Sequence, residues 1–317
     1  MTFSSKQNSI PVTVIINIFN GSQTLSRAID SILDQDILPV RIIIWDNQST
    51  DDIAAVVSDY PDVDYYLAPS HTSLGEARKL ARQLVDTQWF CYLDADDYWY
   101  SSKLREQAPF LNAQVGLIYS SVEERTSSGK LIRTIKSPYS SGYQIDRLLN
   151  RWEISLVTAL INNDILNMHS LDFDSSFFAS EEQDLITQLS CYSPFVSIPK
   201  VHGVITVTNG SLTDRSLKVL GPERRRTLGK IKNSTPFAFS DVLYTQSFSK
   251  SYYYDCMYLM HSMDFVLARR HLKSLALISP SKYLLLYLIS FSPSLWFLVH
   301  NRPLKSIFIS YLDFLFR

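Results

Sequence analysis

The feature that most restricts the fold is a regular alternation of strand-like and helix-like segments over about the first hundred residues. The predicted strands are β-branched or aromatic runs at 12–18, 41–45, 63–67 and 89–93, and the first three are each followed by a segment with helical spacing of its apolar residues. Strands that alternate with helices at this interval form crossover units. The sequence therefore predicts an α/β fold with a mostly parallel sheet covered by helices on both faces.

Short polar stretches mark the expected helix starts. Ser22 follows an Asn-Gly turn and is predicted to cap the first helix, and the run Ser49-Thr50-Asp51-Asp52 is predicted to begin the second. After Asp97 the pattern is less regular. It predicts a hairpin from 115–122 and 130–135, a strand within 152–161, a helix over 181–190, strands at 195–198 and 204–208, and helices from Pro222 onward, with this proline in the first turn.

These patterns divide the chain into a polar N-terminal tail (1–9), an α/β domain (10–216) and a helical, apolar C-terminal region (217–317), with a boundary near Leu217. The three cysteines are far apart, so neither a zinc motif nor a disulfide framework is indicated. A net charge of −1 argues against a protein that binds nucleic acid through its phosphates. The first residues lack the charged and then apolar run of a signal peptide, so we expect a cytoplasmic location.

Polar side chains collect at the carboxyl ends of the predicted strands. The first strand ends in Asn17-Ile18-Phe19-Asn20, the second is followed by Asp46-Asn47, and the fourth by Asp94-Ala95-Asp96-Asp97. Ligands of open parallel sheets bind beyond these ends, so the sequence predicts a polar-ligand site there. Closely spaced carboxylates suit Mg²⁺ or Mn²⁺, which take oxygen ligands and keep positions for phosphate. The alternative is a solvated acidic turn in which Asp97 caps the following helix.

Two stretches carry a resemblance to a known family. VTVIINIFNGSQTLSRAIDSILDQDILPVRIIIWDNQSTDD and GEARKLARQLVDTQWFCYLDADDYWYSSKL together resemble the N-terminal half of the family 2 glycosyltransferases, which have the GT-A fold. The resemblance is close over about residues 10–110 and thinner to about Ser211. Several motifs match in order and spacing, which is more specific than any one of them alone.

On the donor side, the resemblance implies a role for six residues in binding a nucleotide and for one in holding a metal ion. The nucleotide-binding residues are Asn17, Phe19, Asp46, Asn47, Arg78 and Asp94, and the metal ligand is Asp96. The family usually has Asp in place of Asn47 and Asn in place of Lys79. An amide oxygen at Asn47 can still accept a hydrogen bond from the imide N–H of a pyrimidine, so UDP or dTDP sugars are favoured as donors.

On the acceptor side, Glu182 matches the position of the catalytic base, where the family has Asp. Glu can perform the same proton transfer, although its additional methylene moves the carboxylate by about 1.5 Å. Glu181, Asp184 and His202 are further candidates for the acceptor side or for supporting the site. The alternative is an acidic helix N-terminus that is stabilised only by the helix dipole.

The resemblance implies an inverting, metal-dependent transfer from a nucleoside-diphosphate sugar to a saccharide or a lipid-linked saccharide, as in the assembly of bacterial surface polysaccharides. Two other functions compete with it. A non-catalytic sugar-nucleotide-binding scaffold fits the departures at Asn47, Lys79 and Glu182. A nucleotidyltransferase would normally have a basic, glycine-rich loop after the first strand, where this chain has Asn20-Gly21-Ser22-Gln23.

The C-terminal region contains two features that concern location. Residues 283–299 carry no charge but are short for a membrane span and include Pro293. Basic residues flank this segment, at Lys282, Arg302, Lys305 and Arg317, and a basic cluster lies upstream, at Arg224-Arg225-Arg226, Lys230 and Lys232. Together they predict peripheral association with the cytoplasmic face of the membrane. The alternative is a helical subdomain that packs on the catalytic domain or on a second subunit.

Overall fold

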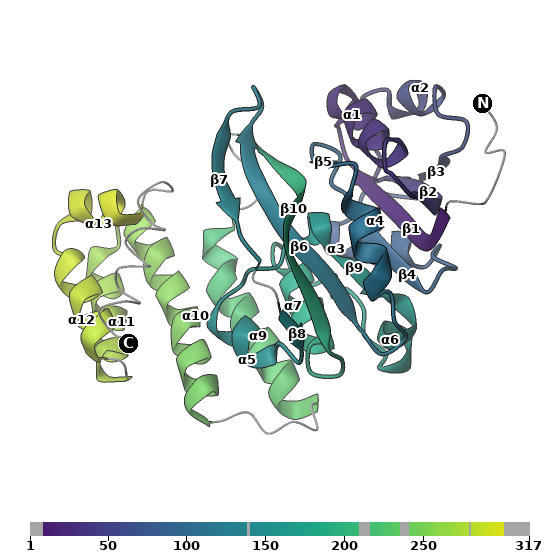
Figure 1. The fold of residues 1–317 in the computed structure, drawn as a ribbon. Coiled ribbons are helices and arrows are strands. Elements are labelled where there is room, and N and C mark those ends of the chain that lie inside the picture. The colour runs from purple at the N-terminus through teal and green to yellow at the C-terminus, as the bar shows by residue number, and fades with distance from the viewer. Residues whose placement is uncertain (1–8, 138–139, 209–215, 235–240, 279, 301–317) are drawn as a thin grey trace. The chain divides into compact units, whose positions relative to one another are not determined.

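The computed structural model describes residues 9–137, 140–208, 216–234, 241–278 and 280–300 (Figure 1). These residues form two compact units, one reaching residue 208 and the other starting at residue 216. The strands of the first unit are β1 (Ser9–Ile18), β2 (Leu38–Asp46), β3 (Asp64–Leu67), β4 (Trp89–Tyr92), β5 (Tyr98–Trp99), β6 (Leu117–Thr126), β7 (Leu131–Ile135), β8 (Ser140–Gly142), β9 (Leu160–Asn162) and β10 (Phe195–Val207). Its α-helices are α1 (Ser22–Leu33), α2 (Ile53–Val57), α3 (Leu74–Arg82), α4 (Lys103–Gln107), α5 (Ile145–Asn150), α6 (Asn163–Met168) and α7 (Glu181–Leu189).

The strands form one sheet in the order β3-β2-β1-β4-β9-β6-β10-β5, with β7 paired to β6 and β8 paired to β10. β1 is parallel to both β2 and β4, and β2 is parallel to β3. The short β9 runs antiparallel to β4 and β6 and joins the N-terminal strands to the rest of the sheet. The prediction of an α/β fold with a mostly parallel sheet is therefore confirmed.

Helices cover both faces of this sheet because successive residues of a buried strand point to opposite sides. On β1, Val14 and Ile16 pack in the same core cluster as Leu25 of α1, whereas Ile15 packs in the cluster that includes Ala77 of α3. Leu185 of α7 belongs to that second cluster. The second face therefore brings α3 and α7 together against the sheet.

Of the two predicted helix starts, one has a different cap from the one predicted and the other is confirmed. Ser22 does not cap α1: Gly21 occupies that position, and the backbone N–H of Ser22 donates to Asp51 Oδ2 at 2.8 Å. The acceptor comes from the loop after β2, so the residues around Ser22 could not reveal it; the helix is present, and only the prediction of its cap is wrong. The second helix behaves as predicted, because Asp52 accepts the N–H of Ala55.

The region after Asp97 also departs from the prediction. Asp97 does not cap α4, whose cap position is Ser102; its buried carboxylate accepts the N–H of Thr206 at 2.8 Å. The strand predicted within 152–161 is reduced to β9. The two strands predicted at 195–198 and 204–208 are one strand, β10, whose register against β6 shifts between residues 198 and 203. The predicted hairpin is present as β6 and β7, which extend beyond the other strands in Figure 1.

The second unit is helical, as predicted. Its helices are α9 (Leu217–Ser234), α10 (Asp241–His261), α11 (Phe265–Ile278), α12 (Pro280–Ile289) and α13 (Pro293–His300). α9 begins before Pro222, which lies inside the helix and not in its first turn. A core of apolar side chains, including Met260, Leu272 and Trp296, holds the helices together.

Two residues of the predicted basic cluster form contacts within this unit, whereas the flanking Arg302, Lys305 and Arg317 lie outside the described residues. Arg224 donates to Ser247 Oγ at 2.7 Å, and Arg225 forms an ion pair with Asp255 at 2.8 Å. These two arginines therefore connect α9 to α10. Within the residues that the structure describes, no helix has both the length and the apolar character needed to cross a bilayer.

Candidate functional site

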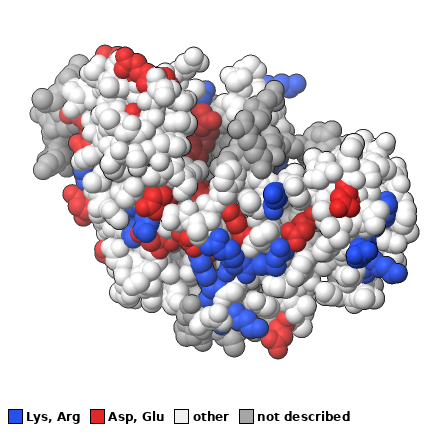
Figure 2. Space-filling model, turned by 180° about the vertical axis from the view of Figure 1, so that it is seen from behind, with Lys and Arg blue, Asp and Glu red and all other residues white. Residues whose placement is uncertain are grey.

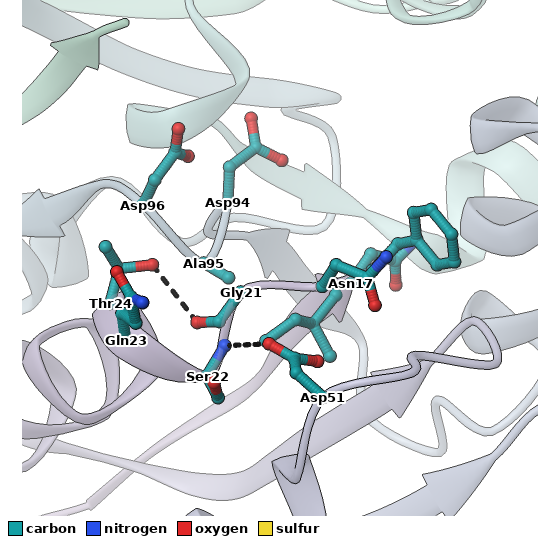
Figure 3. A pocket seen from close by; sticks show the side chains of 12 residues that line it. Asn17, Gly21, Ser22, Gln23, Thr24, Asp51, Asp94, Ala95 and Asp96 are labelled. Carbon is teal, nitrogen blue, oxygen red and sulfur yellow. Dashed lines mark hydrogen bonds between the residues drawn. The ribbon is translucent and has the colours of Figure 1, made fainter.

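A cleft of about 560 Å³ opens beyond the carboxyl ends of β1 and β4 (Figure 3). It is lined by residues 17–24, by Asp51 and by residues 94–96. The parallel register places Ile15 beside Tyr92, so the residues that follow the two strands meet at the same edge of the sheet. The polar segments that end the first and fourth predicted strands therefore do come together.

Asp94 and Asp96 supply the negative charge of the cleft, and their carboxylates point the same way in Figure 3. Oδ1 of Asp94 lies 3.1 Å from Arg78 Nη2. Asp96 has no ion pair among the described residues. Burial and the nearby charge of Asp94 raise the pKa of the Asp96 carboxyl. The charge of Arg27 opposes this rise, but without an ion pair the Asp96 carboxylate keeps oxygens that can bind a cation.

The side chains at the cleft can be compared with the ligands that a divalent metal ion requires. No group of three or more His, Cys, Asp or Glu side chains in the described parts of the chain could hold a metal ion. Three aspartates line the cleft; Asp51 accepts the N–H of Ser22 through Oδ2, which leaves Asp94 and Asp96 as the pair on the loop after β4. Mg²⁺ is often held by one or two carboxylates, with substrate phosphates and water completing its shell. The two aspartates therefore fit a metal ion that binds together with a diphosphate.

Arg78 joins the cleft to the N-terminus of α7. Its buried guanidinium places Nη1 2.5 Å from Glu181 Oε1 and 3.4 Å from Glu182 Oε2, while Nη2 contacts Asp94. Burial by itself would lower the pKa of Arg78, but the three carboxylates raise it, so the side chain stays charged. One cation thus connects the predicted donor residues to the predicted acceptor residues.

Close packing of α3 against α7 makes this contact possible. A Cβ atom on Gly75 of α3 would lie 3.2 Å from the carbonyl oxygen of Asp174 and 3.4 Å from Glu181 Cβ. Glycine therefore lets the two helices approach at the turn before Arg78. The Tyr92 hydroxyl donates to the carbonyl oxygen of Arg78 and ties α3 to β4.

Of the three acidic residues predicted on α7, only Glu182 is accessible. Its side chain is 27% exposed, whereas Glu181 is 2% exposed. Asp184 is fully buried and accepts a hydrogen bond from Gln188 Nε2 at 3.0 Å. Burial raises the pKa of Glu182 to about 7; Arg78 opposes this rise, and the charges of Glu181 and Asp94 add to it. A carboxylate with a pKa near neutrality suits a general base.

Asp46 and Asn47, which were predicted to bind the nucleotide, already form hydrogen bonds within the protein. Asp46 accepts the N–H of Ser49 at 2.8 Å and the hydroxyl of Tyr65 at 2.7 Å. Asn47 Oδ1 accepts both the N–H and the hydroxyl of Thr72, and Nδ2 donates to the Thr72 carbonyl. The oxygen that was predicted to accept an imide N–H from the base therefore already accepts two hydrogen bonds. Neither residue lines the cleft.

Phe19 lines the cleft, and 49% of its surface is exposed. Its ring centroid lies 4.3 Å from that of His71, whose Nδ1 contacts the Asn47 carbonyl oxygen at 2.9 Å. The two rings are tilted by 43° to each other, and His71 is not among the residues that line the cleft.

His202 is not brought to the cleft. It is buried on β10, where its Nε2 lies 3.1 Å from Glu106 Oε2 on α4. The sequence could not reveal this partner, because the two residues are 96 positions apart.

Two residues were missed by the sequence analysis, one beside the cleft and one in its lining. Arg27 of α1 donates to the carbonyl oxygen of Asp96 and to Thr206 Oγ1. Asp51 lines the cleft and binds the first turn of α1 through Ser22. The only local signal was that Asp51 belongs to a helix-start motif, and that motif pointed to α2 and not to α1.

The model of the family described as Glycosyl transferase family 2 matches residues 13–170. The chain belongs to glycosyl transferase family 2. The matched range includes Arg78, Asp94 and Asp96, while α7 with Glu182 follows it. In this family 2 glycosyltransferase, the range that the family model matches therefore contains all the residues that line the cleft, and α7 lies beyond it.

Two curated relatives illustrate the level of similarity. This glycosyltransferase is 25% identical over 168 residues to UDP-Glc:alpha-D-GlcNAc-diphosphoundecaprenol beta-1,3-glucosyltransferase WfgD of Escherichia coli, covering 51% of this chain and 64% of that protein. It is 30% identical over 125 residues to the amylovoran biosynthesis glycosyltransferase AmsB of Erwinia amylovora, covering 36% and 42%. The chain spans less than two thirds of the length of each of these curated relatives.

Solved structures establish the fold. S. aureus TarS 1–349 in complex with UDP has a TM-score of 0.65 at 13% identity, covering 96% of this chain and 92% of that chain. The mannosyltransferase PcManGT from Pyrobaculum calidifontis, in complex with GDP-Man and Mn²⁺, has a TM-score of 0.59 at 14% identity, covering 97% and 86%. The predicted GT-A fold followed by a helical region is confirmed.

Proposed function

We propose that this protein transfers a sugar, with inversion, from a nucleoside-diphosphate sugar to a saccharide or lipid-linked saccharide. The observation that carries the proposal is the Arg78 junction, which ties the cleft carboxylate Asp94 to the accessible carboxylate Glu182. A donor bound in the cleft and an acceptor bound at α7 would then lie on either side of the Arg78 guanidinium.

The donor end is supported by the chemistry of the cleft. Asp94 and Asp96 would hold Mg²⁺ or Mn²⁺ together with the diphosphate, and a bound metal ion neutralises charge on the leaving group. PcManGT was solved with GDP-Man and Mn²⁺, and TarS with UDP and with UDP-GlcNAc. The names of two E. coli relatives specify UDP-Glc as the donor. We therefore favour a uridine or thymidine diphosphate sugar.

At the acceptor end, Glu182 takes the proton of the attacking hydroxyl. The hydroxyl oxygen forms a bond to the anomeric carbon as the bond from that carbon to the diphosphate oxygen breaks, and the proton moves to the Glu182 carboxylate. Arg78, held by Glu181, keeps Glu182 in place and is a positioning residue in this scheme.

The acceptor class rests on the relatives. WfgD and WfaP are named for transfer to GlcNAc-diphosphoundecaprenol, and AmsB is named for amylovoran biosynthesis. We propose a lipid-linked saccharide acceptor and a role in making a cell-surface polysaccharide.

Calorimetric titration with UDP and dTDP, with and without Mn²⁺, tests the donor proposal. We expect binding that depends on Mn²⁺. Absence of binding by these ligands, and by GDP and CDP, would contradict the proposal. Binding of the UDP sugar without release of UDP, in the presence of a GlcNAc-diphosphoundecaprenol acceptor, would instead favour a sugar-nucleotide-binding scaffold.

We also propose that the C-terminal helices contact the inner leaflet of the membrane. An apolar patch, defined by the exposed side chains of Leu284, Leu288 and Phe291 on and after α12 and of Leu295 and Leu298 on α13, is unusual for a water-facing surface. No Asp or Glu occurs from residue 265 to residue 300, while Arg270 and Lys273 are exposed on α11. In Figure 2 the C-terminal helices, on the right, present mainly uncharged atoms on the face shown. A segment rich in apolar side chains, with basic but no acidic residues over 265–300, suits an anionic lipid surface.

Flotation with phosphatidylglycerol-containing vesicles tests this surface. We expect the protein to float with these vesicles and to bind phosphatidylcholine vesicles more weakly. Changing Leu284, Leu288 and Phe291 together to Ser should lower partitioning by about 100-fold, because each exposed side chain contributes about 1 kcal/mol or more on insertion. The matched control changes Val40, Leu131 and Ile132, which are similarly exposed on the first unit, to Ser. Equal flotation of the two variants would contradict the proposal.

A further inference from the structure

We propose that Asp97 anchors the metal-binding loop after β4 and is not itself a metal ligand. Arg27 and Thr206 complete this anchor. The inference rests on the proposed use of a metal ion with a nucleoside diphosphate, and it names the residues that position the metal site. The loop, residues 93–97, joins β4 to β5. Asp94 and Asp96 line the cleft, whereas Asp97 does not and is only 3% exposed.

Asp97 shapes the loop through its backbone and holds it through its side chain. Its N–H donates to the Asp94 carbonyl oxygen at 3.0 Å, which closes a four-residue turn. The turn carries Asp94 and Asp96, whose carboxylates point the same way in Figure 3. The Asp97 carboxylate is used inside the protein, because its Oδ1 accepts the N–H of Thr206 on β10 at 2.8 Å.

Arg27 of α1 makes a second connection between the loop and β10. Its Nη2 donates to the Asp96 carbonyl oxygen and, at 3.0 Å, to Thr206 Oγ1. Its guanidinium carbon also lies 4.9 Å from the ring centre of Tyr98, the first residue of β5. Thr206 therefore serves both connections, since its N–H binds Asp97 and its hydroxyl binds Arg27.

The acceptor that Arg27 binds is informative. An arginine beside aspartates readily forms an ion pair with a carboxylate, as Arg78 does with Asp94. Arg27 has no ion pair among the described residues and binds the backbone carbonyl of Asp96. It therefore fixes the position of Asp96 without occupying the carboxylate that would bind the metal ion.

Two competing explanations make different predictions. If Asp97 is a metal ligand, its negative charge is needed, whereas an anchor needs only an oxygen that accepts the Thr206 N–H. Asn supplies that oxygen without the charge. If Arg27 acts only through its charge, its removal should strengthen the binding of Mn²⁺, because like charges repel. Loss of an anchor predicts the opposite sign, which is weaker binding.

The experiment measures Mn²⁺ binding in the presence of UDP, from the electron paramagnetic resonance signal of free Mn²⁺, relative to UDP and Mn²⁺ without protein. We expect Asp97→Asn to change the Mn²⁺ affinity by less than about 3-fold, and Asp97→Leu to weaken it by about 10- to 100-fold, as for residues that support a metal ligand. Thr206→Val and Arg27→Gln should each weaken it by about 10-fold. The double variant should lose little more than either, because the two changes remove the same hydrogen bond.

Arg133→Gln is the control for Arg27→Gln. It also removes one arginine charge, but Arg133 lies on β7, outside the cleft-lining residues, where it pairs with Glu124. We expect this variant to bind Mn²⁺ and UDP as the wild type does. Thr206→Val keeps the shape of the side chain and serves as the test if Asp97→Leu does not fold.

Three results would overturn the inference. A loss of Mn²⁺ binding in Asp97→Asn as large as in Asp96→Asn would make Asp97 a ligand. Tighter Mn²⁺ binding in Arg27→Gln would leave Arg27 a purely electrostatic role. Unchanged Mn²⁺ affinity in Thr206→Val, with a lower melting temperature, would show that the contact only stabilises the fold. If the wild-type protein binds no UDP in Mn²⁺, the proposed function itself fails, which differs from a loss confined to the variants.

Discussion

Replacing Glu182 by Gln is expected to lower the turnover number for sugar transfer by about 10²–10⁴-fold while UDP affinity stays unchanged. Gln keeps the size of the side chain and can still contact Arg78, but it cannot take a proton. Glu182 is the accessible acidic residue of α7, whereas Glu181 and Asp184 are buried. Turnover is measured as UDP release in the presence of acceptor, and donor binding by calorimetry.

The dependence of kcat/KM on pH in the wild-type enzyme also tests the role of Glu182 as the base. Burial and the neighbouring carboxylates raise the pKa of Glu182 to about 7, so this group is protonated and inactive as a base below neutrality. The ratio kcat/KM should therefore rise with pH through about 7 and then level off, because kcat/KM reports the free enzyme. In Glu182→Gln this step should disappear from the residual activity.

A matched control for this variant is Asp164→Asn. Asp164 is an exposed acidic residue in the first turn of α6, as Glu182 is an acidic residue in the first turn of α7. Its change removes one negative charge from a helix N-terminus away from the cleft-lining residues. Full turnover in Glu182→Gln would exclude Glu182 as the catalytic base. An equal loss of turnover in Asp164→Asn would show that removing a negative charge from any helix N-terminus has this effect.

Replacing Asp96 by Asn is expected to abolish the dependence of donor binding on Mn²⁺ and to weaken UDP binding in Mn²⁺ by about 100-fold or more. Loss of residues that merely support a metal ligand already costs about 10- to 100-fold in affinity. Asp96 has no competing ion pair among the described residues, while Asp94 is held by Arg78. Asn also removes the charge repulsion with Asp94 that raises the pKa of Asp96. The variant should therefore fold at least as well as the wild type.

Titration of UDP over a range of Mn²⁺ concentrations measures this effect. Asp62→Asn is the control, because Asp62 is an exposed residue outside the cleft and its change alters the net charge equally. A normal Mn²⁺ response in Asp96→Asn would exclude Asp96 as a metal ligand. Loss of the response in both variants would point to a general effect of charge.

Much of the fold could be predicted from the sequence because the signals are local. The alternation of β-branched runs with amphipathic helices predicted β1 to β4 and α1 to α3, and a polar run predicted the Asp52 cap of α2. Because the carboxyl ends of parallel strands lie at the same edge of a sheet, the sequence also predicted that Asn17, Phe19 and Asp94–Asp96 lie near one another. The match of Glu182 to the base position also came from the sequence, through the resemblance of the acidic helix start at 181–182 to an acidic pair in the family.

Tertiary structure decided which of these side chains are free to act. Arg78 meets Glu181 and Glu182 across 103 and 104 residues, and no local spacing predicts that contact. The same holds for Asn47, whose amide is occupied by Thr72, and for Ser22, whose N–H is taken by Asp51. Whether a polar atom is free depends on every group packed around it, and those groups come from distant parts of the chain. The sequence by itself determined the elements and the chemical types at the sheet edge. Packing left Asp96 without an ion pair among the described residues and left the Glu182 side chain partly exposed beside Arg78.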